Sequence, residues 1–240
     1  MPGIYFLIDL RHIDAWVFDL DNTLYDAECQ LFAQIDERMT AFIQDRLGLP
    51  HMQARKLQKD YYVQYGTTMS GLMREHDVEP QQFLDYVHDI DLTVIKPNPS
   101  LAAALADLPG EKYIYTNGST RHAENVAGAL EILHLFDDVY DIKAAQYRPK
   151  PDRAPYETFL RQFDLKPGSA VMFEDIAQNL EPPHALGMTT VLVCSDAAWL
   201  ADEPEEKRPA RTGDGGEHIH YQTNDLTAFL KAATTSQSLA

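Results

Sequence analysis

The sequence AWVFDLDNTLY, residues 15–25, predicts a buried strand that ends in two carboxylates. The strand AWVF is apolar throughout, and its valine and aromatic residues favour an extended chain. Asp19 and Asp21 follow with one residue between them, and on an extended chain such a pair points to the same side. Burying two carboxylates side by side is costly unless a cation lies between them or one is protonated. The stretch therefore predicts a polar site at the carboxyl end of a strand, where open α/β sheets bind ligands.

The rest of the chain divides into two regions that differ in periodicity. Residues 26–95 carry apolar residues at helical spacing, beginning with an expected helix over 28–47. From residue 96 onward, short apolar strands alternate with helices, which is typical of a mainly parallel sheet with helices on both faces. We expect a Rossmann-like, doubly wound α/β core domain formed by residues 1–25 and 96–240, with an all-helical cap domain inserted at residues 26–95.

Some segments of the α/β domain are less clearly patterned. The spacing of apolar residues predicts a helix over 120–133, and a short run near the end of the chain predicts an edge strand over 218–221. Residues 201–217 are rich in proline, glycine and charge, which is typical of a loop. Neither this loop nor residues 1–14 has a predicted role.

The composition limits the kinds of partner. The 240 residues contain 20 lysines and arginines against 37 aspartates and glutamates, for a net charge of −17. A nucleic acid polymer is not an expected partner because it requires a basic surface, whereas a small phosphate ester needs only a locally positive pocket. Cys29 and Cys194 form no disulfide framework and favour a reducing cytoplasm. Neither a signal peptide nor a membrane span is predicted, and we expect a monomer or a homodimer.

Polar residues also follow three later strands of the predicted sheet. They are the segment TNG at 116–118, Lys150 in a loop, and the adjacent acids Glu174 and Asp175. Each alone has an ordinary explanation, as a helix cap, a surface lysine or the start of a loop. Because the carboxyl ends of parallel strands lie at one edge of a sheet, we expect these groups to meet the first two aspartates in one site.

In this order the segments resemble the four motifs of the haloacid dehalogenase-like (HAD) superfamily. The matching segments are VFDLDNTLY (17–25), IYTNG (114–118), YRPKPDRAPYE (147–157) and VMFEDIAQNL (171–180). The helices inserted between the first and second motifs resemble the cap of the C1-capped subfamily I. Within them YGTTMSGL (65–72) is similar to a segment of the pyrimidine 5′-nucleotidase branch. Ile176 departs from the pattern, because many relatives carry a small hydroxyl residue there.

The resemblance implies a Mg²⁺-dependent phosphatase that acts on a small phosphorylated metabolite, most readily a pyrimidine nucleoside 5′-monophosphate. Asp19 would attack as the nucleophile and form an aspartyl-phosphate. Asp21 would protonate the leaving oxygen and then deprotonate water, for which we expect its pKa to be raised by neighbouring carboxylates. Thr116 and Lys150 would complete the catalytic set by donating hydrogen bonds and fixed positive charge to the phosphoryl group, while Thr23 would hold the loop.

The same resemblance implies a metal site and a substrate site. Mg²⁺ suits a site made of oxygen ligands, and these ligands would be Asp19, the backbone carbonyl of Asp21, and Asp175, with Glu174 close by. The expected substrate-binding residues are Asn117, Gly118 and Arg121.

Other functions are compatible with parts of this pattern. A haloacid dehalogenase would share the nucleophile but needs neither a proton donor nor Mg²⁺, so Asp21 and the acids at 174–175 count against it. A phosphatase or phosphomutase acting on a sugar phosphate would use the same covalent intermediate. A sensor that only binds a phosphorylated ligand would gain nothing from a nucleophile beside an acid.

The residues that set specificity are not identified by the sequence. The candidates are Tyr25, Tyr65, Thr67, Met69, Arg121 and His122. The inserted helices also carry three phenylalanines, and aromatic side chains in helices usually belong to a core. We expect a core position for Phe32, Phe42 and Phe83.

Overall fold

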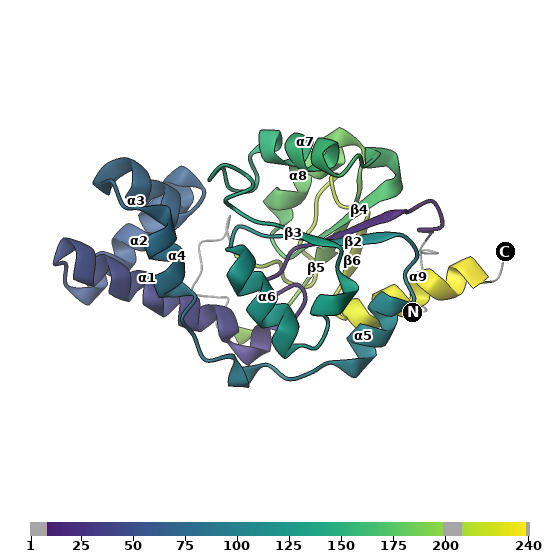
Figure 1. The fold of residues 1–240 in the computed structure, drawn as a ribbon, viewed down its shortest axis with the longest axis horizontal. Helices are drawn as coiled ribbons and strands as arrows, with labels where there is room; N and C mark the ends of the chain where they lie inside the picture. Colours follow the sequence, from purple (N-terminus) through teal and green to yellow (C-terminus); the bar gives the residue numbers. More distant parts are fainter. Residues whose placement is uncertain (1–8, 199–207, 239–240) are drawn as a thin grey trace.

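The protein, in a computed structural model that describes residues 9–198 and 208–238, consists of a sheet covered by helices and a separate block of helices beside it (Figure 1). The predicted segments 1–14 and 201–217 lie only partly within the described residues. Within residues 9–198 and 208–238, no helix is long and apolar enough to cross a membrane.

The sheet is parallel throughout, and its first strand lies in the middle. The strands are β1 (Ala15–Phe18), β2 (Glu111–Tyr115), β3 (Asp138–Tyr140), β4 (Ala170–Glu174), β5 (Thr189–Val193) and β6 (Tyr221–Thr223). They lie in the order β3-β2-β1-β4-β5-β6, and Ala15 of β1 is opposite Glu111 on one side and Ala170 on the other. The predicted Rossmann-like α/β fold is therefore confirmed.

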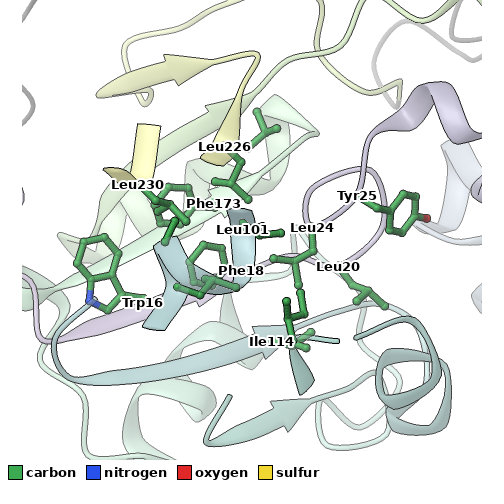
Figure 2. Close-up of a cluster of buried hydrophobic side chains, with 14 of the residues drawn as sticks. Trp16, Phe18, Leu20, Leu24, Tyr25, Leu101, Ile114, Phe173, Leu226 and Leu230 are labelled. Atoms are coloured by element: carbon green, nitrogen blue, oxygen red, sulfur yellow. The ribbon is translucent and has the colours of Figure 1, made fainter. Parts of the chain in front are cut away.

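The two faces of the sheet carry separate buried clusters because side chains alternate along each strand. Trp16 and Phe18 point to the face covered by α5 (Pro99–Ala106), α6 (Thr120–Ala129) and α9 (Leu226–Ser238). Figure 2 shows this cluster, in which the Phe18 and Phe173 rings stack with their centroids 4.6 Å apart. Val17 points to the other face, which α7 (Arg153–Gln162) and α8 (Glu181–Leu186) cover. A strand buried on both faces gives Asp19 a rigid support.

Two predicted elements of this domain have different ends. The helix expected over 120–133 stops at Ala129, because Glu131 adopts a φ of 61°, which an α-helix cannot accommodate. The edge strand expected over 218–221 pairs only from Tyr221, because the Thr190 hydroxyl donates to the backbone oxygen of His218 at 2.6 Å and holds the preceding residues in a turn.

The helical block comprises α1 (Leu31–Leu47), α2 (His51–Tyr65), α3 (Thr68–His76) and α4 (Pro80–Val87), and we use this name for it below. The first helix begins at Leu31 rather than at residue 28, because Asp26 caps a short 3-10 turn and Gln30 then adopts a φ of 58°. The block has its own buried cluster, which also contains Ile142 from the sheet domain. Phe42 and Phe83 pack edge to face in that cluster, whereas Phe32 lies at its partly buried margin.

Candidate active site

The polar groups that follow β1, β2 and β4 lie together at the carboxyl edge of the sheet. The backbone N–H of Asp19 donates to the Phe173 oxygen at 2.9 Å, so this aspartate continues the pairing between β1 and β4. Thr116 follows β2 directly, and Glu174 is the last residue of β4. All three side chains are buried. The parallel register thus brings residues distant in the sequence into one site.

Lys150 occupies the centre of these groups. Its Nζ lies 2.5 Å from Asp19 Oδ1, 2.6 Å from Glu174 Oε1 and 3.2 Å from the backbone oxygen of Tyr115. The Asn117 side chain holds the loop that carries Lys150, which we call the lysine loop, by accepting a hydrogen bond from the Lys150 backbone N–H at 2.9 Å. Burial alone would lower the pKa of the ammonium, but the two carboxylate charges outweigh it and raise that pKa. Lys150 is therefore a permanent positive charge.

Three buried carboxylates surround this single cation. Oxygens of Asp19, Glu174 and Asp175 lie within 4.8 Å of one another. Burial, together with the charges of Glu174 and Asp21, raises the pKa of Asp19 to about 7 despite Lys150. Burial and the charges of Glu174 and Asp19 likewise raise the pKa of Asp175. The raised pKa of Asp19 and of Asp175 shows that the cluster has too little positive charge to balance its carboxylates. A cation that prefers oxygen ligands would supply this charge. The residues present therefore fit a divalent cation.

Glu174 is held by three donors, unlike the other two acids. Its Oε1 accepts from Lys150 and from Asn179 Nδ2, and its Oε2 accepts from the Ile176 backbone N–H, each at 2.6 Å. Ile176 thus contributes through its backbone, although its side chain departs from the family pattern. Within the described chain, Asp19 accepts only from Lys150 and, at a longer 3.4 Å, from the Thr23 hydroxyl. Asp19 and Asp175 therefore keep more capacity for a metal than Glu174 does.

Asp21 is tied through one oxygen only. The Tyr25 hydroxyl donates to Oδ1 at 2.7 Å, and His122 Nε2 lies 2.9 Å from the same atom. Among the described residues, none forms a hydrogen bond with Oδ2. Burial would raise the pKa of Asp21, but the His122 charge and the two hydrogen bonds outweigh burial and lower it. The expected raised pKa of Asp21 is therefore wrong, because an imidazole and a phenol, rather than carboxylates, are the nearest groups.

A second histidine connects this acid to the helical block. His88, the residue directly after α4, stacks on His122 with ring centroids 4.2 Å apart and an interplanar angle of 8°. Its Nδ1 lies 3.1 Å from the Ser119 hydroxyl oxygen. Burial, followed by the charge of His122, lowers the pKa of His88 to about 3, so this ring is neutral near pH 7. The position of α4 is thus linked by direct contact to the partner of Asp21.

A single pocket joins the polar groups of the sheet to the helical block. From the sheet domain it is lined by Asp19, Asp21, Asn22, Thr116, Asn117, Gly118, Lys150, Glu174, Asp175, Ile176, Asn179 and Pro209. From the helical block it is lined by Phe32, Ile35, Asp36, Met39, Gln58, Lys59, Tyr62, Thr67, Thr68, Met69, Phe83, Leu84, Val87 and His88.

Position 118 of this pocket leaves little room for a side chain larger than that of glycine. A Cβ there would lie 3.2 Å from Thr116 Oγ1 and 3.3 Å from His122 Cδ2. The Gly118 backbone N–H also donates to Thr116 Oγ1 at 2.9 Å. The Thr116 hydroxyl proton itself has no acceptor among the described residues. It can therefore donate to a ligand.

Most of the expected site residues line this pocket, but Arg121 does not. Its side chain is 79% exposed, and its nearest acid is Asp85, with 3.9 Å between Nη1 and Oδ1. Among the specificity candidates, Thr67 and Met69 line the pocket, whereas the Tyr65 hydroxyl donates to Glu75 at 2.7 Å.

Five polar side chains are among the pocket residues that the sequence reasoning missed. They are Asn22, Asp36, Gln58, Lys59 and His88. One signal could have indicated Asp36, since it lies on α1 directly after Ile35, whose side chain is buried. A polar side chain beside the apolar stripe of a helix is buried only where it has partners. Gln58, Lys59 and His88 could not be found in this way, because their positions depend on the packing of separate helices.

The family model described as "haloacid dehalogenase-like hydrolase" matches residues 13–187 of the chain. Among curated proteins, the chain is similar to phosphate metabolism protein 8 of Saccharomyces cerevisiae, with 27% identity over 193 residues. The alignment covers 73% of this chain and 60% of the yeast protein, so the chain spans less than two thirds of that relative.

Solved structures with low sequence identity share the fold. A HAD phosphatase from Thermococcus onnurineus superposes with a TM-score of 0.58 at 18% identity, over 91% of this chain and 97% of its own. An L-2-haloacid dehalogenase from Xanthobacter autotrophicus, with chloropropionic acid covalently bound, superposes with a TM-score of 0.54 at 17% identity, over 91% and 97%. Both chemistries therefore occur on this fold, and the side chains must distinguish them.

Proposed function

The chain belongs to the haloacid dehalogenase-like hydrolases, and on this premise we propose that it is a Mg²⁺-dependent phosphatase acting on a small phosphorylated metabolite, by preference a pyrimidine nucleoside 5′-monophosphate. The observation that carries the proposal is Asp21, which lines the pocket together with Asp19 and has one oxygen that no described residue engages. An alkoxide leaving group requires a proton, whereas a halide does not. A second carboxylate beside the nucleophile therefore favours ester hydrolysis.

In the first step Asp19 attacks phosphorus, the bond between phosphorus and the ester oxygen breaks, and Asp21 gives its proton to the leaving oxygen. A bound phosphate dianion raises the pKa of Asp21, because nearby negative charge favours the protonated form. In the second step Asp21 takes a proton from water as the water attacks the aspartyl-phosphate and releases phosphate. The ionised Asp19 is restored at the end of the cycle.

The other residues bind and orient the phosphoryl group. Lys150 places its ammonium beside the nucleophile, and the free hydroxyl proton of Thr116 can donate to a phosphoryl oxygen. Mg²⁺, held by Asp19, Asp175 and the backbone oxygen of Asp21, would neutralise charge on the phosphoryl oxygens. Asn117 acts indirectly by holding the lysine loop. The protein would act as a monomer or homodimer in the cytoplasm.

Phosphate release from a panel of phosphorylated metabolites, measured with and without Mg²⁺, tests this proposal. We expect release from CMP and UMP and no halide release from 2-chloropropionate. Transfer of phosphate to a sugar hydroxyl would indicate a phosphomutase. Binding without turnover of any ester would support a sensor, and full activity in EDTA would overturn the metal-dependent mechanism.

Metal binding should change the dependence of stability on pH. The pKa of Asp19 is raised from 3.8 to about 7 in the metal-free fold, so between these values the folded state holds a proton that the unfolded state has released. This contribution to the free energy of unfolding is present at low pH and is lost as the pH rises through 7. In EDTA the Tm should therefore fall between about pH 4 and 7, and the gain in Tm on adding Mg²⁺ should grow over the same range.

Thermal melts of the wild type and of Asp175→Asn check this expectation. The variant loses one of the two acids with capacity for the metal, so its gain in Tm with Mg²⁺ should shrink at every pH. A wild-type gain that does not vary with pH would contradict the link between these carboxylates and the metal.

The hydrogen bond from Tyr25 should matter most for poor leaving groups. Tyr25→Phe removes one of the two hydrogen bonds to Asp21 Oδ1 while it keeps the ring packed. The ratio of kcat for a nucleotide to kcat for p-nitrophenyl phosphate should fall by about tenfold, because Asp21 loses a contact that orients its carboxyl group and p-nitrophenolate leaves without a proton donor. Tyr140→Phe is the matched control, since the Tyr140 hydroxyl is buried without a partner in the described structure. An equal fall for both substrates would show that Tyr25 does not act through Asp21.

A further inference from the structure

The helical block contributes a wall of mixed character to the pocket. One part is apolar and comes from α1 and α4, with Ile35, Met39, Phe83, Leu84 and Val87. The other part is polar and comes mainly from α1 and α2, with Asp36, Gln58 and Lys59. A substrate that fills the pocket therefore meets apolar surface and hydrogen-bonding groups together, away from the phosphate chemistry of the sheet.

The carboxamide of Gln58 is fixed in one orientation. Its Nε2 donates to Asp36 Oδ1 at 2.5 Å, and its Oε1 accepts from the Thr40 hydroxyl. An ionised carboxylate can only accept hydrogen bonds, so the amide nitrogen must face Asp36. Gln58 and Thr40 are both fully buried, at 1% and 0% exposure. The orientation does not depend on a ligand.

The charge of Asp36 is compensated by two cations. Arg55 Nη1 lies 2.7 Å from Oδ2, and Lys59 Nζ lies 2.7 Å from Oδ1. These two contacts hold the Asp36 carboxylate in place beside Gln58.

The Gln58 carboxamide keeps unused hydrogen-bonding capacity. An amide group has two N–H donors and two acceptor lone pairs, and the bonds to Asp36 and Thr40 use one of each. Among the described residues, no other group engages its side chain. Buried polar groups are rarely left unpaired. One donor and one acceptor on the same planar group thus remain for a ligand in the pocket that Gln58 lines.

We propose that the Gln58 carboxamide, oriented by Asp36 and Thr40, binds the polar edge of the substrate's nucleobase and so determines specificity. The inference rests on the proposed nucleotidase function. A pyrimidine presents hydrogen-bond donors and acceptors side by side on one edge, and its flat faces suit apolar contacts. The carboxamide matches the edge, and the apolar side chains of α1 and α4 match the faces. The sheet domain binds the phosphate, and Gln58 recognises the base.

Steady-state kinetics with CMP, UMP and ribose 5-phosphate test the proposal, because ribose 5-phosphate retains the phosphate and sugar but lacks the base. Gln58→Met keeps the length of the side chain and removes its hydrogen-bonding groups. The ratio of kcat/KM for CMP or UMP to kcat/KM for ribose 5-phosphate should fall by about tenfold or more, mainly through KM. Gln64→Met, an exposed position on the same helix, is the matched control and should keep the wild-type ratio.

The outcomes separate this inference from the function on which it rests. If the wild type hydrolyses nucleotides better than ribose 5-phosphate but Gln58→Met keeps the wild-type ratio, the nucleotidase function stands and base recognition by Gln58 is overturned. If the wild type does not prefer nucleotides to ribose 5-phosphate, both are overturned. Should Gln58→Met fail to fold, Thr40→Val frees the amide oxygen from its anchor and is judged by the same ratio. Calorimetry of CMP and of inorganic phosphate with this second variant should then show weaker binding of CMP only.

Discussion

Replacement of Asp19 or Asp21 by asparagine should disable the protein in two different ways. Asp19→Asn removes the nucleophile, so no aspartyl-phosphate can form and kcat should fall by roughly a thousandfold or more. The fold should persist, because the amide oxygen of asparagine can still accept the hydrogen bond from Lys150 that Asp19 Oδ1 accepts. Asp21→Asn keeps the nucleophile but removes the proton donor and the base for water.

The Asp21→Asn variant should therefore accumulate the covalent intermediate. With p-nitrophenyl phosphate the first step hardly needs a proton donor, whereas the second step still needs a base. Mass spectrometry of rapidly quenched protein should show one added phosphoryl group on the peptide that contains Asp19, and Asp19→Asn should show none. If both variants remain folded and bind Mg²⁺ but neither carries the adduct, the two aspartates do not divide the reaction as proposed.

Loss of the Lys150 charge should reduce both stability and activity. Lys150→Met leaves Asp19 and Glu174 buried without their shared cation, and removing one partner of a buried ion pair costs about 3–5 kcal/mol. The loss should be smaller in Mg²⁺ than in EDTA, because the metal replaces part of the missing charge. The kcat should fall by roughly a hundredfold, since the ammonium stabilises charge on the phosphoryl oxygens.

Urea unfolding of single and double variants checks this account. Adding Glu174→Gln to Lys150→Met should recover part of the lost stability, because it removes a carboxylate that has no counter-ion. Lys143→Met, an exposed lysine in the same loop, should behave as the wild type. If the double variant is less stable than Lys150→Met by the full cost of Glu174→Gln alone, the two residues are not coupled.

The parts of the site on strand ends could be predicted from the sequence because the sheet itself places them. A parallel sheet brings the carboxyl ends of its strands to one edge, so a short apolar run followed by a polar residue locates that residue in space. Asp19, Thr116 and Glu174 follow this rule. The carboxylates at the strand ends also predicted that positive charge lies near them, and Lys150 supplies part of this charge.

The surroundings of Asp21 could not be predicted in the same way. Its partner His122 and the neighbouring Arg121 are adjacent in the sequence, and consecutive residues of a helix point about 100° apart. The phase of α6 turns His122 inward and Arg121 into solvent, and this phase depends on how the helix packs. His88 and Gln58 come from other helices, so only the packing of the helical block against the sheet brings them to the pocket.

The central position of β1 has a consequence for the order of folding. Its partners β2 and β4 both lie far along the chain, with Ala15 paired to Glu111 and to Ala170. Contacts between distant residues form late, because a long loop must close before they can stabilise the fold. A nascent chain that ends before Ala170 carries Asp19 and Asp21 but has no β4 to hold them. The helical block, whose contacts are mostly local, can fold before the strand that precedes it has found either neighbour. Catalytic competence is therefore acquired only when β4 has docked, after most of the chain has been made.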